Sequence, residues 1–238
     1  MTLKGKTVLI TGGSSGIGAA IAFACAEQGA RIALASRSRV KLERVADGLP
    51  KAEVHLVPGD VGVDEEVVDM IESTRKHFGS IDLLVNNAGM GIFKPFSELS
   101  VEEFDSVINT NLRGVFLCTR YVLPIMYEQG GGTIITISSL AGRHGFAGGG
   151  AYCASKFGVM GMMESVFHEA RSRNVRVITI SPGSVDTAFF DEAQTTPPNR
   201  EHILRAEDVA DTVLFAATLP ERALIRELDI RPANPKKG

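Results

Sequence analysis

Short apolar runs alternate with longer helical stretches along the whole chain. The apolar runs contain no regular polar alternation, which is typical of strands that are covered on both faces. They predict seven strands, at Thr7–Ile10, Arg31–Ala35, Val54–Val57, Leu83–Val85, Thr133–Ile137, Val175–Ile180 and Arg226–Ile230. The intervening stretches predict helices over residues 16–28, 38–48, 64–77, 100–128, 151–171 and 206–218.

Strictly alternating strands and helices predict an α/β fold, because a helical crossover joins each pair of parallel strands. We expect one doubly wound domain with about seven parallel strands and helices on both faces. Two helix starts carry local signals: Ser100 and Glu103 form a capping-box pattern, and Asp208 suits the positive end of the last helix. No repeat or linker divides residues 1–238, and the least regular stretch, 184–203, is expected to be a mobile loop.

Composition excludes several classes of protein. The 238 residues are 44% hydrophobic and 22% charged, which is ordinary for a globular domain and argues against a disordered chain, collagen or a coiled coil. The net charge of −3 predicts no nucleic-acid partner. No apolar run reaches the ~18 residues of a membrane span, and the first residues do not resemble a secretion signal. We therefore expect a cytoplasmic protein without a membrane partner.

Cysteines and histidines give no sign of a metal site. Cys25, Cys118 and Cys153 are widely spaced and form no CxxC motif, and the five histidines are scattered. This pattern predicts neither a disulfide framework nor a bound metal. Cys153 adjoins Tyr152, but a small buried cysteine that only packs is the favoured interpretation.

A glycine-rich turn, TGGSSGIG at residues 11–18, follows the first predicted strand directly and leads into a helix. Such a turn lets backbone N–H groups and a helix N-terminus approach a pyrophosphate closely. The glycines at 12, 16 and 18 give the spacing GxxxGxG, which differs from the general GxGxxG fingerprint. A turn without a ligand is the alternative, and its position after the first strand favours a dinucleotide site.

Tyr152 and Lys156 stand four residues apart on a predicted helix, so their side chains share one face. A free tyrosine titrates near ~10, and a cation about 5 Å away lowers the pKa by about two units, into a useful range for acid–base chemistry. A solvated pair on an exposed helix is the alternative. Ser139 follows a strand thirteen residues upstream, where it can bind a substrate oxygen, whereas the adjacent Ser138 can simply cap the next turn.

These motifs together resemble the short-chain dehydrogenase/reductase family over essentially the whole chain. The matching segments occur in the family's order and spacing: TGxxxGIG at 11–18, Asp60-Val61, NNAG at 86–89, Asn111, Ser139, Tyr152 with Lys156, and PGxVxT at 182–187. The resemblance implies one Rossmann-type domain over residues 1–238 that binds a dinucleotide and carries out catalysis. It also implies that stretch 184–203 is the substrate loop.

The resemblance implies a catalytic tetrad of Asn111, Ser139, Tyr152 and Lys156. Tyr152 would transfer a proton to or from the substrate oxygen, which Ser139 would orient. Lys156 would lower the pKa of Tyr152 and hold the nicotinamide ribose, and Asn111 would keep a water that links Lys156 to solvent. The nicotinamide itself would carry the hydride.

The same resemblance assigns a cofactor site. Asp60 would meet the adenine amino group beside the Val61 backbone, NNAG would support the adenosine ribose and the central strand, and PGxVxT would hold the nicotinamide carboxamide. For Asn87 and Ala88, bracing the sheet is an equally good interpretation. The full expected set is Gly12, Ser14, Ser15, Gly16, Ile17, Gly18, Ser36, Arg37, Asp60, Val61, Asn86, Asn87, Ala88, Gly89, Tyr152, Lys156, Pro182, Gly183, Val185 and Thr187.

The end of the second strand predicts the choice of cofactor. Sites that prefer NAD place a carboxylate there, on the ribose diol. Here the strand ends ASRSR at 35–39, where Arg37 offers a charged fork and Ser36 a hydroxyl to a 2′-phosphate. We expect NADP(H) to be preferred over NAD(H). Arg39 is the next cation along the chain, and the simpler interpretation is that it faces solvent.

The expected activity is the NADP(H)-dependent interconversion of a small-molecule carbonyl compound and a secondary alcohol. A 3-oxoacyl-carrier-protein reductase or a hydroxy-acid dehydrogenase is the alternative, followed by a non-catalytic dinucleotide sensor. The ending LIRELDIRPANPKKG lacks the VDGG-like end of many carrier-protein reductases, which argues against fatty-acid synthesis. An apolar substrate wall is expected from Met90, Ile92, Phe146, Phe189 and Phe190. Arg143 and His144 are either substrate contacts or a solvated rim.

Two predicted helices, 100–128 and 151–171, resemble those that pair across a two-fold axis in this family. They carry apolar residues beyond the need of one sheet face: Val115, Phe116, Met160, Met162 and Phe167. We expect a homodimer or a homotetramer. The alternative is that these side chains face the protomer's own core.

Overall fold

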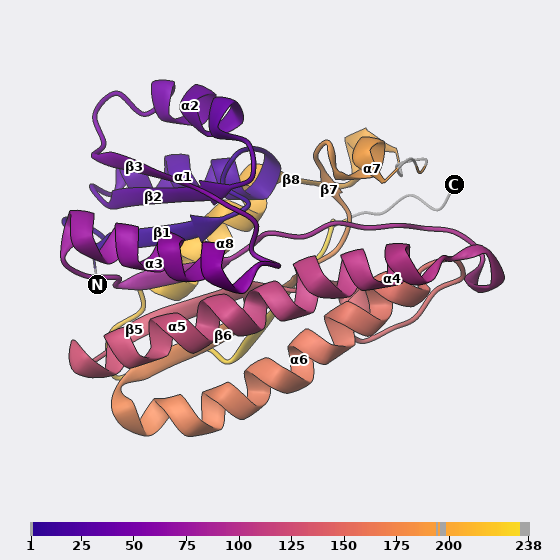
Figure 1. The fold of residues 1–238 in the computed structure, drawn as a ribbon. Coiled ribbons are helices and arrows are strands. Elements are labelled where there is room, and N and C mark those ends of the chain that lie inside the picture. Colours follow the sequence, from indigo (N-terminus) through magenta and orange to yellow (C-terminus); the bar gives the residue numbers. More distant parts are fainter. Residues whose placement is uncertain (1, 194, 196–198, 234–238) are drawn as a thin grey trace.

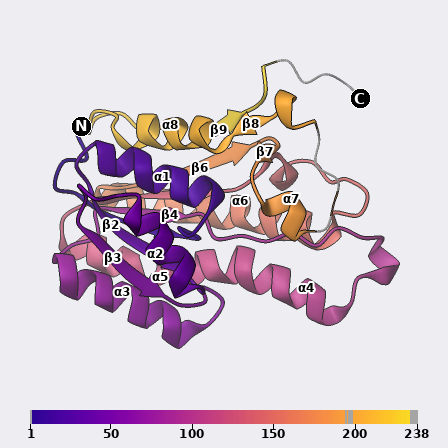
Figure 2. The ribbon, with the colours of Figure 1, turned by 90° about the horizontal axis from the view of Figure 1, so that it is seen from above.

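A parallel sheet of seven strands forms the centre of the molecule in the computed structural model, which describes residues 2–193, 195 and 199–233 (Figures 1 and 2). The strands lie in the order β3-β2-β1-β4-β5-β6-β9. Their bounds are β1 (Thr7–Thr11), β2 (Arg31–Ser36), β3 (Val54–Pro58), β4 (Leu83–Asn86), β5 (Gly132–Ile137), β6 (Val175–Pro182) and β9 (Glu227–Ile230). All seven predicted strands are confirmed.

The central strand β1 pairs in parallel with β2 on one side and β4 on the other. Val8 lies opposite Ile32 in β2 and Leu83 in β4. The chain runs outward from β1 to β3 and then returns across β1 to β4, so the order of strands reverses there. In such sheets ligands bind at the carboxyl ends of the strands beside this switch point.

Helices cover both faces of the sheet, and Figure 2 shows α1 and α8 on the side opposite α3 and α5. Alternate residues of β1 divide between two cores: Val8 and Ile10 pack with α1, α2 and α8, whereas Leu9 packs with α3, α5 and α6. The helices are α1 (Gly16–Glu27), α2 (Arg39–Asp47), α3 (Asp64–Phe78), α4 (Val101–Ile108), α5 (Gly114–Glu128), α6 (Gly150–Ala170) and α8 (Ala206–Ala217). Within the described residues, no helix has the length and apolar character needed to cross a membrane.

The helix predicted over 100–128 is interrupted. Ser100 and Glu103 form the expected capping box and start α4, but a π-helical turn at Asn109–Arg113 separates α4 from α5. A π turn accommodates an extra residue without breaking the helix, and such turns are frequent at functional sites. Asn111 lies in this turn. Asp208 also has the expected place, because its carboxylate accepts the Arg205 N–H at the start of α8.

The stretch 184–203 contains short regular elements, which corrects the expectation of an irregular loop. Strands β7 (Val185–Asp186) and β8 (Leu204–Arg205) pair in parallel at its two ends, and α7 (Phe189–Glu192) lies between them. Val185 and Leu204 are both buried in the core with α8, and this burial fixes the ends of the stretch. Residues 194 and 196–198 of the predicted mobile loop lie outside the described residues.

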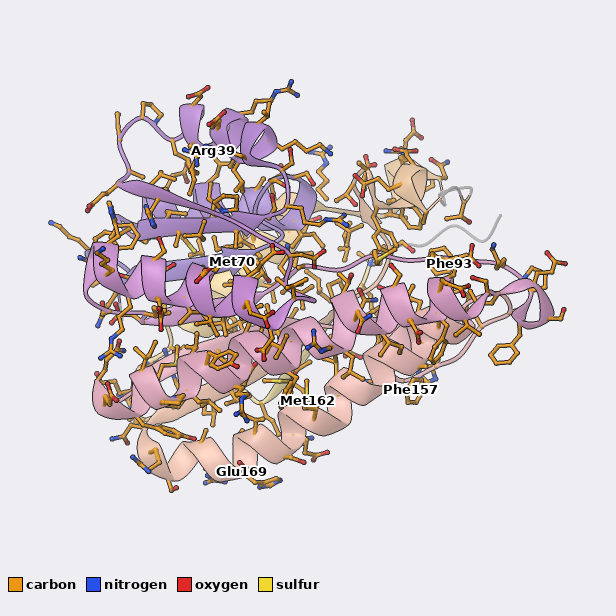
Figure 3. The ribbon with its side chains drawn as sticks, in the orientation of Figure 1. Arg39, Met70, Phe93, Phe157, Met162 and Glu169 are labelled. Carbon is orange, nitrogen blue, oxygen red and sulfur yellow. The ribbon has the colours of Figure 1, made fainter. Side chains whose placement is uncertain are left out.

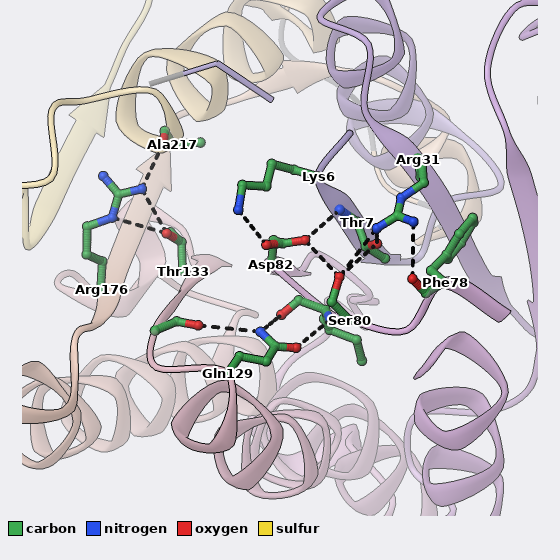
Figure 4. A network of polar contacts seen from close by, with 12 residues as sticks. Lys6, Thr7, Arg31, Phe78, Ser80, Asp82, Gln129, Thr133, Arg176 and Ala217 are labelled. Atoms are coloured by element: carbon green, nitrogen blue, oxygen red, sulfur yellow. Dashed lines mark hydrogen bonds and ion pairs between the residues drawn. The ribbon is translucent and has the colours of Figure 1, made fainter. Parts of the chain in front are cut away.

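A polar network joins the amino ends of the strands, at the edge opposite the predicted site (Figure 4). The Asp82 carboxylate accepts hydrogen bonds from Lys6 Nζ at 2.8 Å, the Thr7 backbone N–H at 2.9 Å and Ser80 Oγ at 3.1 Å. Burial opposes ionisation of Asp82, but these donors outweigh it and lower its pKa. Arg31 and Arg176 bind the starts of neighbouring strands in the same way. Side-chain hydrogen bonds therefore hold the strands together at the amino edge, and we expect ligands to bind at the carboxyl edge.

Candidate active site

A pocket of about 600 Å³ opens at the carboxyl edge of the sheet. Most of the predicted site residues contribute to its wall: Gly12, Ser14, Ser15, Gly16, Ile17, Ser36, Arg37, Asp60, Val61, Asn87, Ala88, Gly89, Ser139, Tyr152, Lys156, Pro182, Gly183, Val185 and Thr187. Three predicted residues, Gly18, Asn86 and Asn111, lie behind the wall.

The glycine turn between β1 and α1 closes one end of the pocket. Gly12 has φ +64°, a left-handed conformation that favours glycine, and a Cβ there would lie 2.9 Å from the Ala88 Cα. A Cβ on Gly18 would lie 2.2 Å from the Gly12 carbonyl oxygen. Gly18 therefore permits the close packing of α1 on the turn and does not line the pocket, in contrast to its predicted place among the cofactor contacts.

The NNAG segment ties β4 to the glycine turn. The Thr11 hydroxyl accepts the backbone N–H groups of Asn87 and Ala88 at 3.0 and 3.1 Å, and Asn87 Nδ2 donates to the Thr11 and Gly12 carbonyls. Both interpretations of Asn87 and Ala88 therefore hold, because they brace the sheet and also line the pocket. Asn86 is buried and donates to Thr119 Oγ1 at 3.1 Å, which joins β4 to α5, and its contact with the cofactor stays a prediction.

Two cations lie at the adenosine end of the predicted site, beyond the end of β2. Arg37 and Lys41 both contribute to the pocket wall, and neither has a carboxylate partner within the described residues. The Ser36 hydroxyl is buried beside them without a hydrogen-bond partner in this part of the chain. Arg39 instead pairs with Glu43 at 3.1 Å on the outer face of α2 (Figure 3). This agrees with the interpretation of Arg39 as a solvated side chain.

Lys41 was missed by the sequence interpretation. Ser38 caps α2 by accepting the Lys41 backbone N–H at 3.4 Å, so Lys41 stands in the first turn of that helix. The serine before an apolar-periodic stretch is a helix-start signal that could have placed it there. A helix N-terminus with Arg37 and Lys41 beside it suits an anionic group such as a phosphate.

Asp60 and Val61 line the pocket next to Arg37. The Asp60 carboxylate accepts the Gly62 N–H at 2.8 Å, and the Asp60 N–H donates to Glu66 at 2.8 Å. These bonds fix the carboxylate at the end of β3. The structure therefore brings Asp60 to the adenosine end, where the resemblance placed it.

Ser139, Tyr152 and Lys156 meet in the pocket wall at the other end. Tyr152 and Lys156 project from the same face of α6, and Lys156 Nζ lies 5.7 Å from the Tyr152 ring centroid. Lys156 Nζ also donates to the Ile137 carbonyl at 3.0 Å, which anchors it at the end of β5. Ser139 follows the same strand, so one strand end and one helix face build the group.

Asn111 acts at a distance from the pocket. It is fully buried, and its side chain accepts the Met90 N–H at 2.8 Å and donates to the Met90 carbonyl and to Ser155 Oγ at 2.9 and 3.0 Å. Met90 follows β4, and Ser155 adjoins Lys156. The side chain thus joins the β4 loop to α6, and the role of Asn111 in keeping a water near Lys156 stays a prediction.

Aromatic side chains close the end of the pocket around Tyr152. Phe146, Phe189 and Phe190 contribute to the wall as expected, together with Met90. Ile92 does not, and its neighbour Phe93, which the sequence interpretation missed, takes that place (Figure 3). The sequence could not distinguish Ile92 from Phe93 as the wall residue, because no periodic pattern continues beyond β4.

Arg143 and His144 lie in different surroundings. The Arg143 guanidinium pairs with Glu227 at 2.5 Å and Asp229 at 3.4 Å on β9, whereas His144 lines the pocket. Of the two residues named as substrate contacts or rim, His144 can reach a substrate and Arg143 fastens the loop to the sheet.

Comparisons with known proteins agree with this geometry. The family model for short chain dehydrogenases matches residues 6–198. An uncharacterized oxidoreductase of Staphylococcus aureus is 36% identical over 230 residues, which cover 97% of this chain and 98% of the relative. The chain belongs to the short-chain dehydrogenase family.

Solved structures of other family members superimpose closely on this short-chain dehydrogenase. An alcohol dehydrogenase from the archaeon Thermococcus sibiricus, complexed with 5-hydroxy-NADP, is similar with a TM-score of 0.90 and 31% identity, over 98% of this chain and 99% of that one. A 3-ketoacyl-(acyl-carrier-protein) reductase from Brucella melitensis, complexed with NADH, has a TM-score of 0.90 and 27% identity, over 98% and 99%.

The electrostatics of this dehydrogenase differ from the sequence expectation. Burial raises the pKa of Tyr152 to about 12, and the Ser139 hydroxyl opposes this only in part. Burial also lowers the pKa of Lys156 to about 8. The expectation that Lys156 lowers the pKa of the phenol considered their separation but not their removal from water. Desolvation disfavours the charged form of each group, and it is the largest cause of both pKa shifts.

Replacing Lys156 by methionine should stabilise the folded dehydrogenase below pH 8. The folded ammonium has a pKa of about 8, against an ordinary value of 10.5, so its burial costs the fold about 3 kcal/mol at pH 7. This cost falls as the pH rises from 8 to 10.5, because the unfolded chain then binds the extra proton. Urea unfolding of wild type and variant at pH 7 and pH 10.5 measures the difference. A difference that does not change with pH would contradict it.

Proposed function

We propose that this protein is an NADP(H)-dependent oxidoreductase that interconverts a carbonyl group and a secondary alcohol of a small molecule. One observation carries the proposal: Ser139, Tyr152 and Lys156 converge at one end of a pocket whose other end is a glycine turn with two cations beside it. This arrangement places an acid–base group and a cofactor cradle in a single cavity. Oxidoreductase activity is also the printed description of the Staphylococcus aureus relative.

The residues of the pocket suit a nicotinamide dinucleotide. Gly12 and Gly18 bring the turn and α1 together without side chains between them, so that backbone N–H groups can face a pyrophosphate. The wall also contains Pro182, Gly183, Val185 and Thr187, and we place the carboxamide contacts there. When bound, the nicotinamide supplies or accepts a hydride.

The remaining steps belong to protein side chains. With a pKa of about 12, the Tyr152 phenol is protonated at neutral pH and is ready to donate its proton to a carbonyl oxygen. The Ser139 hydroxyl donates a hydrogen bond to the same oxygen and orients it. Lys156 binds the nicotinamide ribose and lies beside the Tyr152 ring. Asn111 positions α6 against the β4 loop. A protonated acid favours the direction of reduction.

Charge supports the choice of NADP(H). Arg37 and Lys41 face the adenosine end without carboxylate partners in the described residues, and the partnerless Ser36 hydroxyl can donate to a phosphate. The two solved relatives divide, one holding 5-hydroxy-NADP and the other NADH. The preference therefore depends on this chain's own cations.

Three alternative functions fit less well. A non-catalytic dinucleotide sensor would not need an acid–base group in the wall, yet Ser139, Tyr152 and Lys156 are all there. A 3-oxoacyl-carrier-protein reductase is represented by the Brucella melitensis relative at 27% identity, but this chain lacks the VDGG-like ending. A hydroxy-acid dehydrogenase needs a partner for a carboxylate, which the substrate end of the pocket lacks among its described residues.

We further propose a cytoplasmic location and a small-molecule substrate, with residues 184–203 as the substrate loop. The three cysteines are buried and free, which suits a reducing compartment. Ala188, Phe189, Phe190 and Glu192 of the substrate loop line the pocket.

Tyr152→Phe should reduce carbonyl reduction at least about 100-fold, because it removes the proposed proton donor. Affinity for NADPH should change little, since the ring remains in place. Lys156→Ala should lower both turnover and cofactor affinity, because Lys156 is assigned to both. Steady-state kinetics and equilibrium NADPH titration measure the two effects. If the phenylalanine variant kept more than about a tenth of the activity, the proton would come from another group.

The double variant Ser36→Asp, Arg37→Ala should invert the cofactor preference. The wild type should favour NADPH over NADH by about 10- to 100-fold in kcat/KM, as expected for one charge-assisted contact. The variant removes this attraction and adds repulsion of the 2′-phosphate. Arg39→Ala is the matched control, because Arg39 pairs with Glu43, and it should retain the wild-type preference. Equal efficiency of the wild type with both cofactors would overturn the assignment.

The proposed homo-oligomer rests on one predicted residue, Phe116, and on one residue that was not predicted, Phe157. Val115 and Phe167 are buried in the protomer's own core, and Met162 packs against it, so for these the alternative interpretation holds. Phe116 on α5 remains 44% exposed, and Phe157 on α6, which was not predicted, is 48% exposed (Figure 3). Both side chains lie on the outer surface of the helix layer α3, α5 and α6.

Phe116→Glu combined with Phe157→Glu should dissociate the protein into single chains of 25.4 kDa. The wild type should scatter light as a particle of two or four times that mass, because these rings need an apolar partner surface. Val40→Glu is the control, since Val40 is 59% exposed on α2, away from α5 and α6. A wild type of 25.4 kDa at micromolar concentrations would show that this surface has no partner copy.

A further inference from the structure

Two phenylalanine rings from separate segments pack on the ring of Tyr152, and a third packs on one of these two. Phe93 comes from the loop after β4, Phe146 from the loop before α6, and Phe189 from α7. The Tyr152 ring lies 5.5 Å from Phe93 and 5.7 Å from Phe189, and Phe93 lies 5.8 Å from Phe146. These are edge-to-face and tilted geometries, which aromatic groups prefer. Phe146 is 51% exposed, so part of this surface is free to receive another ring.

Among the lysines and arginines of the described wall, only Lys156 lies at this end of the pocket, whereas Arg37 and Lys41 lie at the adenosine end. Because Lys156 is assigned to the nicotinamide ribose and donates to the Ile137 carbonyl, it is not free to pair with a substrate carboxylate. Glu192 is the carboxylate at the substrate end, and the His144 imidazole can donate a hydrogen bond while neutral.

Cations near the substrate end are engaged elsewhere. Arg143 pairs with Glu227 and Asp229, Arg200 pairs with Asp186 and Asp191, and Lys94 pairs with Glu103 at 2.6 Å. A substrate carboxylate would therefore lose its hydration and meet an acidic side chain in return. An unpaired charge in such a site is strongly disfavoured.

Ser138 offers a second hydroxyl next to Ser139. Its side chain contributes to the wall, but its Oγ is buried and has no hydrogen-bond partner in the described residues. A buried polar group without a partner is costly, so a ligand that supplies an acceptor gains if the Ser138 side chain rotates toward the pocket. After that rotation, two neighbouring hydroxyls would suit two adjacent oxygens.

We propose that the substrate is an uncharged aryl ketone with a second, neutral carbonyl group next to the first, such as an aryl α-keto ester or aryl diketone. Its ring packs on Phe93, Phe146 and Phe189, the reacting oxygen meets Ser139 and Tyr152, and the second oxygen meets Ser138. The ketone gains a hydride and the Tyr152 proton and becomes a secondary alcohol. This inference rests on the proposed reductase function and names the substrate class of the same site.

Methyl benzoylformate and benzoylformate form a matched pair for the test, because they differ only in whether the second carbonyl group carries a charge. NADPH oxidation by the purified full-length protein should be at least about 100-fold more efficient with the ester in kcat/KM. Equal efficiency, or preference for the acid, would overturn the inference. Reduction of uncharged aliphatic ketones alone would also overturn it while leaving the proposed function intact. If a panel of activated ketones and diketones gave no oxidation, the proposed function itself would fail.

Variants separate the three contacts. Phe93→Ala should raise the KM for methyl benzoylformate about 10-fold with little change in kcat, whereas Phe96→Ala, 77% exposed and outside the pocket, should change neither. Ser138→Ala should lower kcat/KM for the ester but not for acetophenone, which lacks the second oxygen. Unchanged kinetics of Phe93→Ala or Ser138→Ala with the ester would contradict the corresponding contact.

His144→Arg tests the charge argument by gain of function, with the rings left in place. It adds a cation to the wall and should narrow the ester-to-acid ratio at least about 10-fold. Equilibrium NADPH titration and circular dichroism confirm that each variant is folded and binds cofactor. A ratio that stays at the wild-type value in folded His144→Arg would show that charge does not set the specificity.

Discussion

The carboxyl ends of β1 and β4 must separate to leave space for a ligand, and the Thr11 hydroxyl makes that separation possible. Beyond Thr11 the two strands no longer pair, so the N–H groups of Asn87 and Ala88 need other acceptors. Thr11 Oγ1 accepts both and is itself within 3.3 Å of the Val85 carbonyl. Asn87 then reaches the Gly12 carbonyl, and the Gly18 position brings α1 against the same atom. The cradle, the helix and the strand thus share one small set of bonds.

Burial is the second organising cause. It moves the pKa of Tyr152 up and that of Lys156 down, and both groups are thereby driven toward their neutral forms. The pairing of charged side chains also differs between the two ends of the pocket. Unpaired cations lie at the adenosine end, whereas the arginines around the substrate end are paired with carboxylates. This difference separates a region suited to phosphate from one suited to uncharged apolar groups.

The two edges of the sheet divide stability and function between them. At the amino edge, Asp82, Arg31 and Arg176 bind neighbouring strands through side chains, as Figure 4 shows. At the carboxyl edge the wall is assembled from loops and short elements, including α7 and the π turn that carries Asn111. Those loops can vary in sequence without loss of the fold, because the strands are already fixed at the other end.

The sequence by itself determined the seven strands, the family and most of the pocket wall, because apolar runs and short motifs are local signals. It did not locate Lys41, Phe93 or Ser138 in the wall, and it could not show that Gly18, Asn86 and Asn111 lie behind the wall. The tertiary structure decided these positions, since a side chain's direction depends on how its element packs and not on its spacing. It also decided the pKa values: the sequence gives the separation of Tyr152 and Lys156 on a helix, but only packing shows that both are withdrawn from water.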